Sequence, residues 1–127
     1  MASEVARRKN RLAEVCGAFP EVETSGAQHL TFQVHKRTFA YYLDNHQGDG
    51  RIALVCKATL ADQDFLVKLY PDRFYVAPYL GHRGWIGLRL DTPEVDWSEV
   101  SDLAERAYRL VAPKRLVALL NKVKNNP

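Results

Sequence analysis

The residues best suited to chemistry lie in a tight corner between two stretches of strand-forming sequence. Gly81 and Gly84 flank His82 and Arg83, so the backbone can adopt positive φ while two polar side chains are held at the tip. The arginine offers a fork of hydrogen-bond donors and the histidine a switchable charge, and both suit a phosphate group. Trp85 follows and could stack on a base or on a partner.

Each of these residues also has a structural interpretation. Arg83 could pair with Asp91 or with a strand-end carbonyl and so hold the corner together. Trp85 could pack beneath the segment 114–115.

Further cations could contact phosphates. Lys114 and Arg115 follow Pro113 at an expected helix start, where backbone N–H groups already favour an anion. The alternative for Lys114 and Arg115 is ordinary solvated surface. The complete set of candidate nucleic-acid contacts is Lys36, Arg37, Arg51, Lys57, His82, Arg83, Trp85, Arg89, Lys114 and Arg115.

Catalytic patterns are absent from the sequence. There is no Gly-x-Ser-x-Gly, no phosphate-cradling glycine loop and no His-Glu-x-x-His. His29 and His35 share a strand face, but six residues along a strand span about 20 Å, too far for one metal ion. His46 and Asp49 could form an acid–base pair, although ordinary loop composition explains them better. We therefore expect no enzyme, no cofactor and no metal.

Composition indicates one ordinary globular domain over residues 1–127, with a net charge of +3 that allows an anionic partner. Cys16 and Cys56 lack any metal-ligand spacing and are expected to be buried thiols. The chain has no apolar run of about 20 residues and no secretory signal, so we expect a cytoplasmic protein that does not enter a membrane.

The order of expected elements indicates an α+β domain. Ser3 caps a helix that runs to about residue 16, and a polar connection over 20–28 leads to strands at 29–35, 38–44 and 51–57. A short helix begins after Thr59, two strands flank the corner, and two helices, broken at Ala112, follow Asp96. This order predicts an antiparallel sheet of about five strands with the helices packed on one face.

Alternation along the strands predicts which residues face the helices. Leu30, Phe32 and Val34 point inward, as do Ile52, Leu54 and Cys56, although Val55 suggests partial cover on the other side. In the second strand we expect Phe39, Tyr41 and Leu43 inward and Ala40 and Tyr42 outward. The outer face, left to solvent or a partner, would display His29, His35, Tyr42, Arg51, Lys57, Trp85 and Arg89. Such a face can stack bases and hold phosphates.

Residues 78–91, with the sequence PYLGHRGWIGLRLD, resemble the MmcQ/YjbR family of small bacterial proteins, and Asp96-Trp97 and residues 112–116 support the resemblance. It implies a frataxin-like (CyaY-like) fold and the DNA binding with which the family is commonly labelled, but no catalytic set. The frataxin similarity also raises iron handling through an acidic first helix. That helix instead carries Arg7, Arg8, Lys9 and Arg11, which do not suit iron.

The sequence thus favours a DNA-binding module, monomeric or weakly dimeric, that holds phosphates with the cations above and stacks Trp85. The alternative is a protein-interaction module that docks a partner on the open sheet around Trp85. Salt dependence of binding separates the two.

Overall fold

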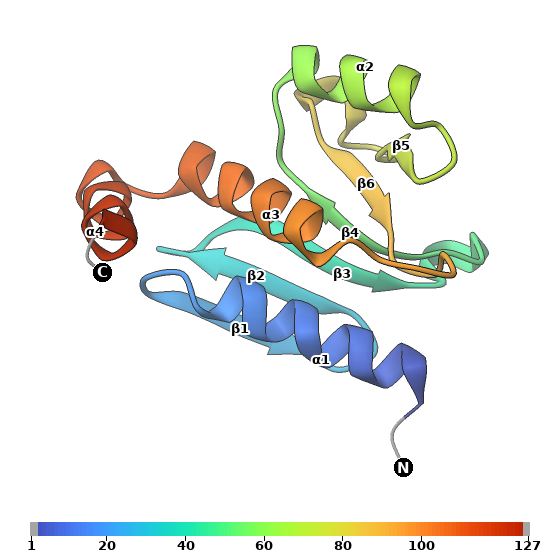
Figure 1. Ribbon diagram of the computed structural model, residues 1–127, viewed down its shortest axis with the longest axis horizontal. Coiled ribbons are helices and arrows are strands. Elements are labelled where there is room, and N and C mark those ends of the chain that lie inside the picture. Colours follow the sequence, from blue (N-terminus) through green and yellow to red (C-terminus); the bar gives the residue numbers. More distant parts are fainter. Residues whose placement is uncertain (1–2, 126–127) are drawn as a thin grey trace.

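In a computed structural model, which describes residues 3–125, a six-stranded antiparallel sheet carries four α-helices (Figure 1). This confirms the predicted α+β class, with one strand more than expected. The strands, in spatial order, are β1 (Val22–Gly26), β2 (Leu30–Val34), β3 (Arg37–Asp44), β4 (Ile52–Cys56), β6 (Ile86–Arg89) and β5 (Phe74–Val76).

The additional strand is β1, which pairs with β2 from Val22 opposite Val34 to Gly26 opposite Leu30. The prediction of a polar connection over 20–28 was therefore wrong. Only Val22 is partly buried and the other four residues of β1 are exposed. An edge strand that buries neither face shows no hydrophobic alternation, so the periodicity on which strand prediction relies is missing.

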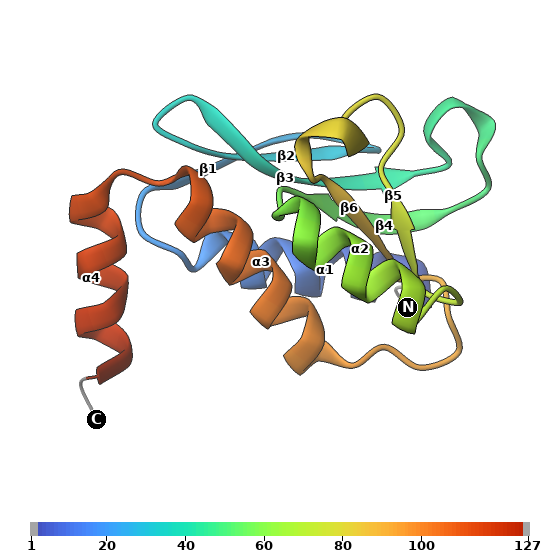
Figure 2. The same cartoon turned by 90° about the horizontal axis from the view of Figure 1, so that it is seen from above.

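The helices α1 (Glu4–Gly17), α2 (Leu60–Leu69) and α3 (Trp97–Val111) lie on one face of the sheet, and α4 (Lys114–Asn125) lies beyond its end (Figure 2). The predicted caps are present. The Ser3 hydroxyl accepts from the Ala6 amide at 3.1 Å and the Thr59 hydroxyl from the Asp62 amide at 3.0 Å. No helix within the described residues is long and apolar enough to cross a bilayer.

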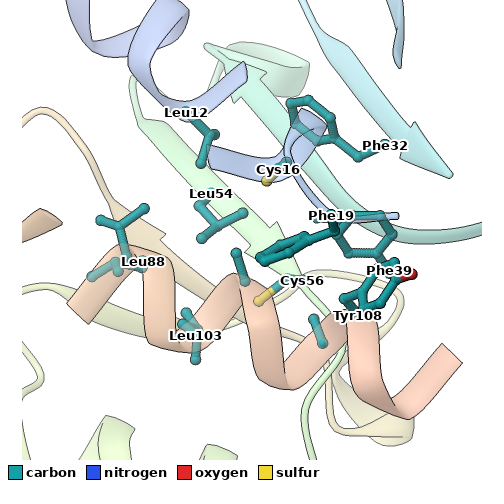
Figure 3. Packing of buried hydrophobic residues seen from close by; sticks show 14 of the residues in the cluster. Leu12, Cys16, Phe19, Phe32, Phe39, Leu54, Cys56, Leu88, Leu103 and Tyr108 are labelled. Carbon is teal, nitrogen blue, oxygen red and sulfur yellow. The ribbon is translucent and has the colours of Figure 1, made fainter. Parts of the chain in front are cut away.

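The main core fills the space between the sheet and these helices (Figure 3). Phe19 and Phe39 both pack on the ring of Tyr108, with centroids 5.1 and 5.6 Å away, and the Tyr108 hydroxyl donates to the Pro20 carbonyl at 2.8 Å. Cys16 and Cys56 are free thiols in this core, as predicted. Burial raises the pKa of Cys16 to about 12.

A β-bulge changes which side chains of β3 face the core. Phe32 lies opposite Ala40 and Gln33 opposite Thr38, which leaves Phe39 as the extra residue. Because both Phe39 and Ala40 are buried, the alternation beyond them is shifted by one residue. Tyr42 therefore points into the core, and Tyr41 and Leu43 lie on the opposite face, the reverse of the prediction.

Candidate nucleic-acid interface

The connection between β5 and β6, residues 77–85, folds over the sheet face that the long helices leave uncovered. It contains a short 3₁₀ turn, η2 (Gly81–Arg83), and with β4 it builds a second buried cluster of Ala53, Val55, Ala77 and Trp85. Trp85 lies on the predicted side of the sheet but is only 7% exposed, with its ring centroid 5.7 Å from that of Tyr41. The expectation of a solvent-exposed tryptophan was wrong, because this connection and the shifted Tyr41 cover it.

Two residues, Gln63 and Gly84, hold the connection in place. The buried Gln63 of α2 donates from Nε2 to the carbonyls of both Gly81 and Trp85, each at 2.8 Å. Gly84 has φ +90°, and a Cβ there would lie 2.4 Å from the Ala58 carbonyl oxygen. Its glycine identity is required by both the backbone angle and the close approach. The corner that stood out in the sequence is therefore a rigid platform fixed by α2.

This platform brings three of the sequence-predicted cations together. Arg37, Lys57 and Arg83 line a hollow of about 290 Å³ with Thr38, Trp85, Leu110 and Val111, which we call the basic hollow. It lies where β3 begins, β4 ends and α3 ends. Its lining contains no carboxylate.

The side chains of the three cations of the basic hollow form no hydrogen bond or ion pair with any other residue from 3 to 125. The C-terminal end of α3 carries about half a negative charge, which offsets only a small part of three positive charges. Arg83 and Arg37 are exposed and Lys57 is half-buried, so their charged groups are accessible to an anion. The proposed internal partner of Arg83, Asp91, instead binds Arg89.

Two further cations adjoin the basic hollow along the chain. Lys36 precedes Arg37 in the tight turn between β2 and β3 and is exposed. The start of α4 lies beside this turn, because Arg115 contacts His35 at 3.3 Å. Lys114 is exposed at that helix start. Positive charge therefore continues from the basic hollow over this end of the molecule.

Arg115 itself is engaged by a carboxylate. It donates to both carboxylate oxygens of Glu21, at 2.9 and 3.2 Å. These hydrogen bonds, and to a smaller extent the hydrogen bond from His35, hold the pKa of Glu21 below its usual value. Glu21 neutralises this arginine, so Arg115 is a weaker candidate for a phosphate than its neighbour Lys114.

Arg51 and Arg89 lie away from the basic hollow. Arg51 stands at the opposite end of β4 from Lys57, about 20 Å along the strand, with its guanidinium 4.0 Å from the ring centroid of Tyr75. Arg89 donates to both oxygens of Asp91, at 2.9 and 3.0 Å, and these bonds lower the pKa of that carboxyl. His82 is exposed on the η2 turn. The predicted contacts therefore do not form one continuous surface.

The sequence did not indicate a second hollow, of about 240 Å³, on the sheet face that the connection 77–85 covers. We call it the apolar hollow; its lining is Tyr41, Leu43, His46, Val55, Ala77, Pro78, Tyr79 and Leu80. Tyr79 is 75% exposed, has φ +65° and donates from its hydroxyl to Gln47 Oε1 at 3.0 Å. Nothing local in the sequence indicates this hollow, because the bulge in β3 is what turns Tyr41 and Leu43 toward it.

Metal-binding chemistry is not indicated by the described part of the chain, where no three His, Cys, Asp or Glu side chains gather as a metal site would require. His29 and His46 do approach each other, with ring centroids 5.6 Å apart, but His29 Nδ1 accepts a hydrogen bond from the Asp44 amide at 3.0 Å.

Comparison with known proteins relates the chain to a family model and to a solved structure. The family model described as YjbR matches residues 17–110. The crystal structure of the Deinococcus radiodurans protein DR2400, described as containing a DUF419 domain, is similar with a TM-score of 0.68 and 21% sequence identity, covering 84% of this chain and 79% of that one. At that identity the likeness concerns the fold alone. No curated protein matches the chain.

Proposed function

The chain belongs to the YjbR family, and from that premise we propose that it is a cytoplasmic, non-catalytic DNA-binding module that holds the sugar–phosphate backbone at the basic hollow. One observation carries the proposal: Arg37, Lys57 and Arg83 line a single hollow that has no carboxylate in its wall. Other cations of the surface, such as Arg89 and Arg115, are paired with carboxylates.

The chemistry of these side chains suits phosphate oxygens. An arginine can grip a phosphate with two parallel N–H groups, and a lysine supplies a compact charge with three donors. Since none of the three has to leave an internal ion pair, binding releases counterions without breaking a bond inside the protein.

The expected salt dependence follows from the number of contacts. Arg37, Lys57 and Arg83, with Lys36 and Lys114 beside them, supply about three to five phosphate contacts, which for duplex DNA corresponds to a slope of log affinity against log salt of roughly −3 to −4.5. Between about 50 and 200 mM salt, affinity should therefore fall roughly 40- to 500-fold.

The test compares two double variants that remove the same charge. Lys57→Ala with Arg83→Ala should flatten the salt slope by about two units, measured by fluorescence anisotropy with a labelled oligonucleotide. Arg51→Ala, just before β4, with Arg89→Ala, at the end of β6 that pairs with the start of β4, should leave the slope unchanged. Equal effects of the two double variants would show that only net charge matters, and absence of binding at the lower salt would refute DNA binding altogether.

A protein-interaction module is the second candidate, favoured by exposed apolar residues at the β5 edge and the connection that follows it. Val76 is 50% exposed and Tyr79 75% exposed. A partner docked there would bind with little dependence on salt, and the Lys57 and Arg83 double variant would bind it as wild type does. Trp85, buried at the centre of this face, would support such a surface from beneath rather than contact the partner.

A further inference from the structure

The apolar hollow lies close to the end of the sheet at which the basic hollow is found, and residues of the connection 77–85 line both. Val55 of β4 lines the apolar hollow, and Lys57, which directly follows β4, lines the basic one. Their Cα atoms are two residues apart, about 7 Å along the extended chain. The packed rings of Trp85 and Tyr41 form the wall between the two. An apolar site and a cationic site are thus neighbours, as a base and the phosphate of its own nucleotide are.

The lining of the apolar hollow suits a flat, partly polar ring. Its walls are aromatic and aliphatic side chains, and polar groups occur at His46 and at the hydrogen bond between Tyr79 and Gln47. At about 240 Å³ the hollow is smaller than the roughly 300–1,000 Å³ of sites for drug-sized ligands, so it admits one heterocycle rather than a large cofactor.

At this hollow the backbone of Tyr79 adopts a left-handed conformation, with φ +65°, which residues other than glycine disfavour. A non-glycine residue in the left-handed region is under strain, and such strain concentrates where a ligand is gripped. With 75% of the residue exposed, packing does not require the ring to stand there. Its aromatic face is available to a ring that enters the hollow.

We propose that the apolar hollow receives one unstacked base of a single strand whose adjoining phosphate lies in the basic hollow, so that the protein prefers single-stranded to duplex DNA. This inference rests on the DNA binding proposed above. In a duplex the base is stacked and paired, and moving it into the hollow would require opening the helix. In a single strand the base is already available, and an aromatic side chain can stack on any base without reading its sequence.

The experiment compares two labelled single strands of equal length at one salt concentration, one with normal bases and one abasic at every position. Both present the same phosphates to the basic hollow. Wild type should bind the base-bearing strand roughly 5- to 150-fold more tightly, the range expected for stacking of one base on an aromatic side chain. It should also bind that strand more tightly than the corresponding duplex.

Tyr79→Gly removes the ring while glycine retains the positive φ, and it should bring the two strands to nearly equal affinity. Leu43→Trp, which fills the hollow from β3, should have the same effect. Phe65→Ala, an exposed aromatic of α2 on the helical side, is the matched control and should preserve the preference for bases.

The outcomes separate this inference from the proposed function. Equal binding of both strands by wild type, or duplex binding as tight as single-strand binding, overturns the base site. If that binding keeps its steep salt dependence, the basic hollow and the proposed function stand. Failure of wild type to bind either strand or the duplex overturns both.

Discussion

The hydrogen bonds of Gln63 make the connection 77–85 a sensitive place to perturb this protein. Gln63→Leu keeps most of the side-chain volume but removes the donor that reaches the carbonyls of Gly81 and Trp85. Each carbonyl keeps one backbone partner, since Gly81 also accepts from the Gly84 amide at 3.0 Å and Trp85 from the Ala77 amide at 3.2 Å. The variant therefore loses two neutral hydrogen bonds without leaving either acceptor wholly unpaired.

At about 1 ± 0.5 kcal/mol for each bond, the free energy of unfolding should fall by about 2 kcal/mol. Urea unfolding followed by circular dichroism should show a midpoint lower by roughly 1 M. Gln28→Leu is the control, because Gln28 is exposed and donates a single hydrogen bond, to the Asp44 carbonyl at 3.1 Å; it should change stability by less than about 0.5 kcal/mol.

A loss for Gln63→Leu no larger than that of the control would refute the reasoning that α2 fixes the connection. DNA affinity supplies a second readout, because Arg83 is carried by the same connection. The variant should bind DNA more weakly than wild type under conditions where both remain folded, and unchanged affinity would show that the placement of Arg83 does not depend on Gln63.

Two further predictions concern the turn glycine and the buried thiols. Gly84→Ala should lower the free energy of unfolding by at least about 3 kcal/mol in chemical denaturation, because strain at positive φ adds to a collision with a backbone carbonyl. Gly48→Ala, where φ is +76° and no atom lies within 4 Å of the added Cβ, should lower it by only about 1–2 kcal/mol, and equal losses would contradict the packing argument. Cys16 and Cys56 should resist alkylation at pH 8 in the folded protein and react as urea unfolds it, because burial raises the pKa of both thiols and the thiolate is the reactive form. Mass spectrometry measures the extent of alkylation, and rapid modification without denaturant would contradict the prediction.

Much of the fold could be predicted from local sequence signals. Helix caps at Ser3, Thr59 and Asp96 satisfy amides two or three residues away, so their information is contained in a few neighbouring residues. The break at Ala112, whose backbone is extended at φ −68° and ψ 147°, follows from the proline after it.

Two features of the sheet could not be predicted in this way. The polar strand β1 exists because β2 offers it an edge, and its own residues show no alternation. The bulge at Phe39 depends on the pairing of β3 with β2, and it reverses the facing of Tyr41 and Tyr42. Both depend on a neighbouring strand rather than on the segment itself.

By itself, the sequence determined the α+β class, the order of all elements except β1, and the residue types from which an anion site could be built. Only the tertiary structure decided which of those residues can act together. It places Arg115 against Glu21, 94 residues away in the chain, while Arg37, Lys57 and Arg83 meet in one hollow that contains no carboxylate. The physical reason is that a charge is neutralised or left available by neighbours in space, and those neighbours are set by strand pairing and by the seating of the connection 77–85 on α2.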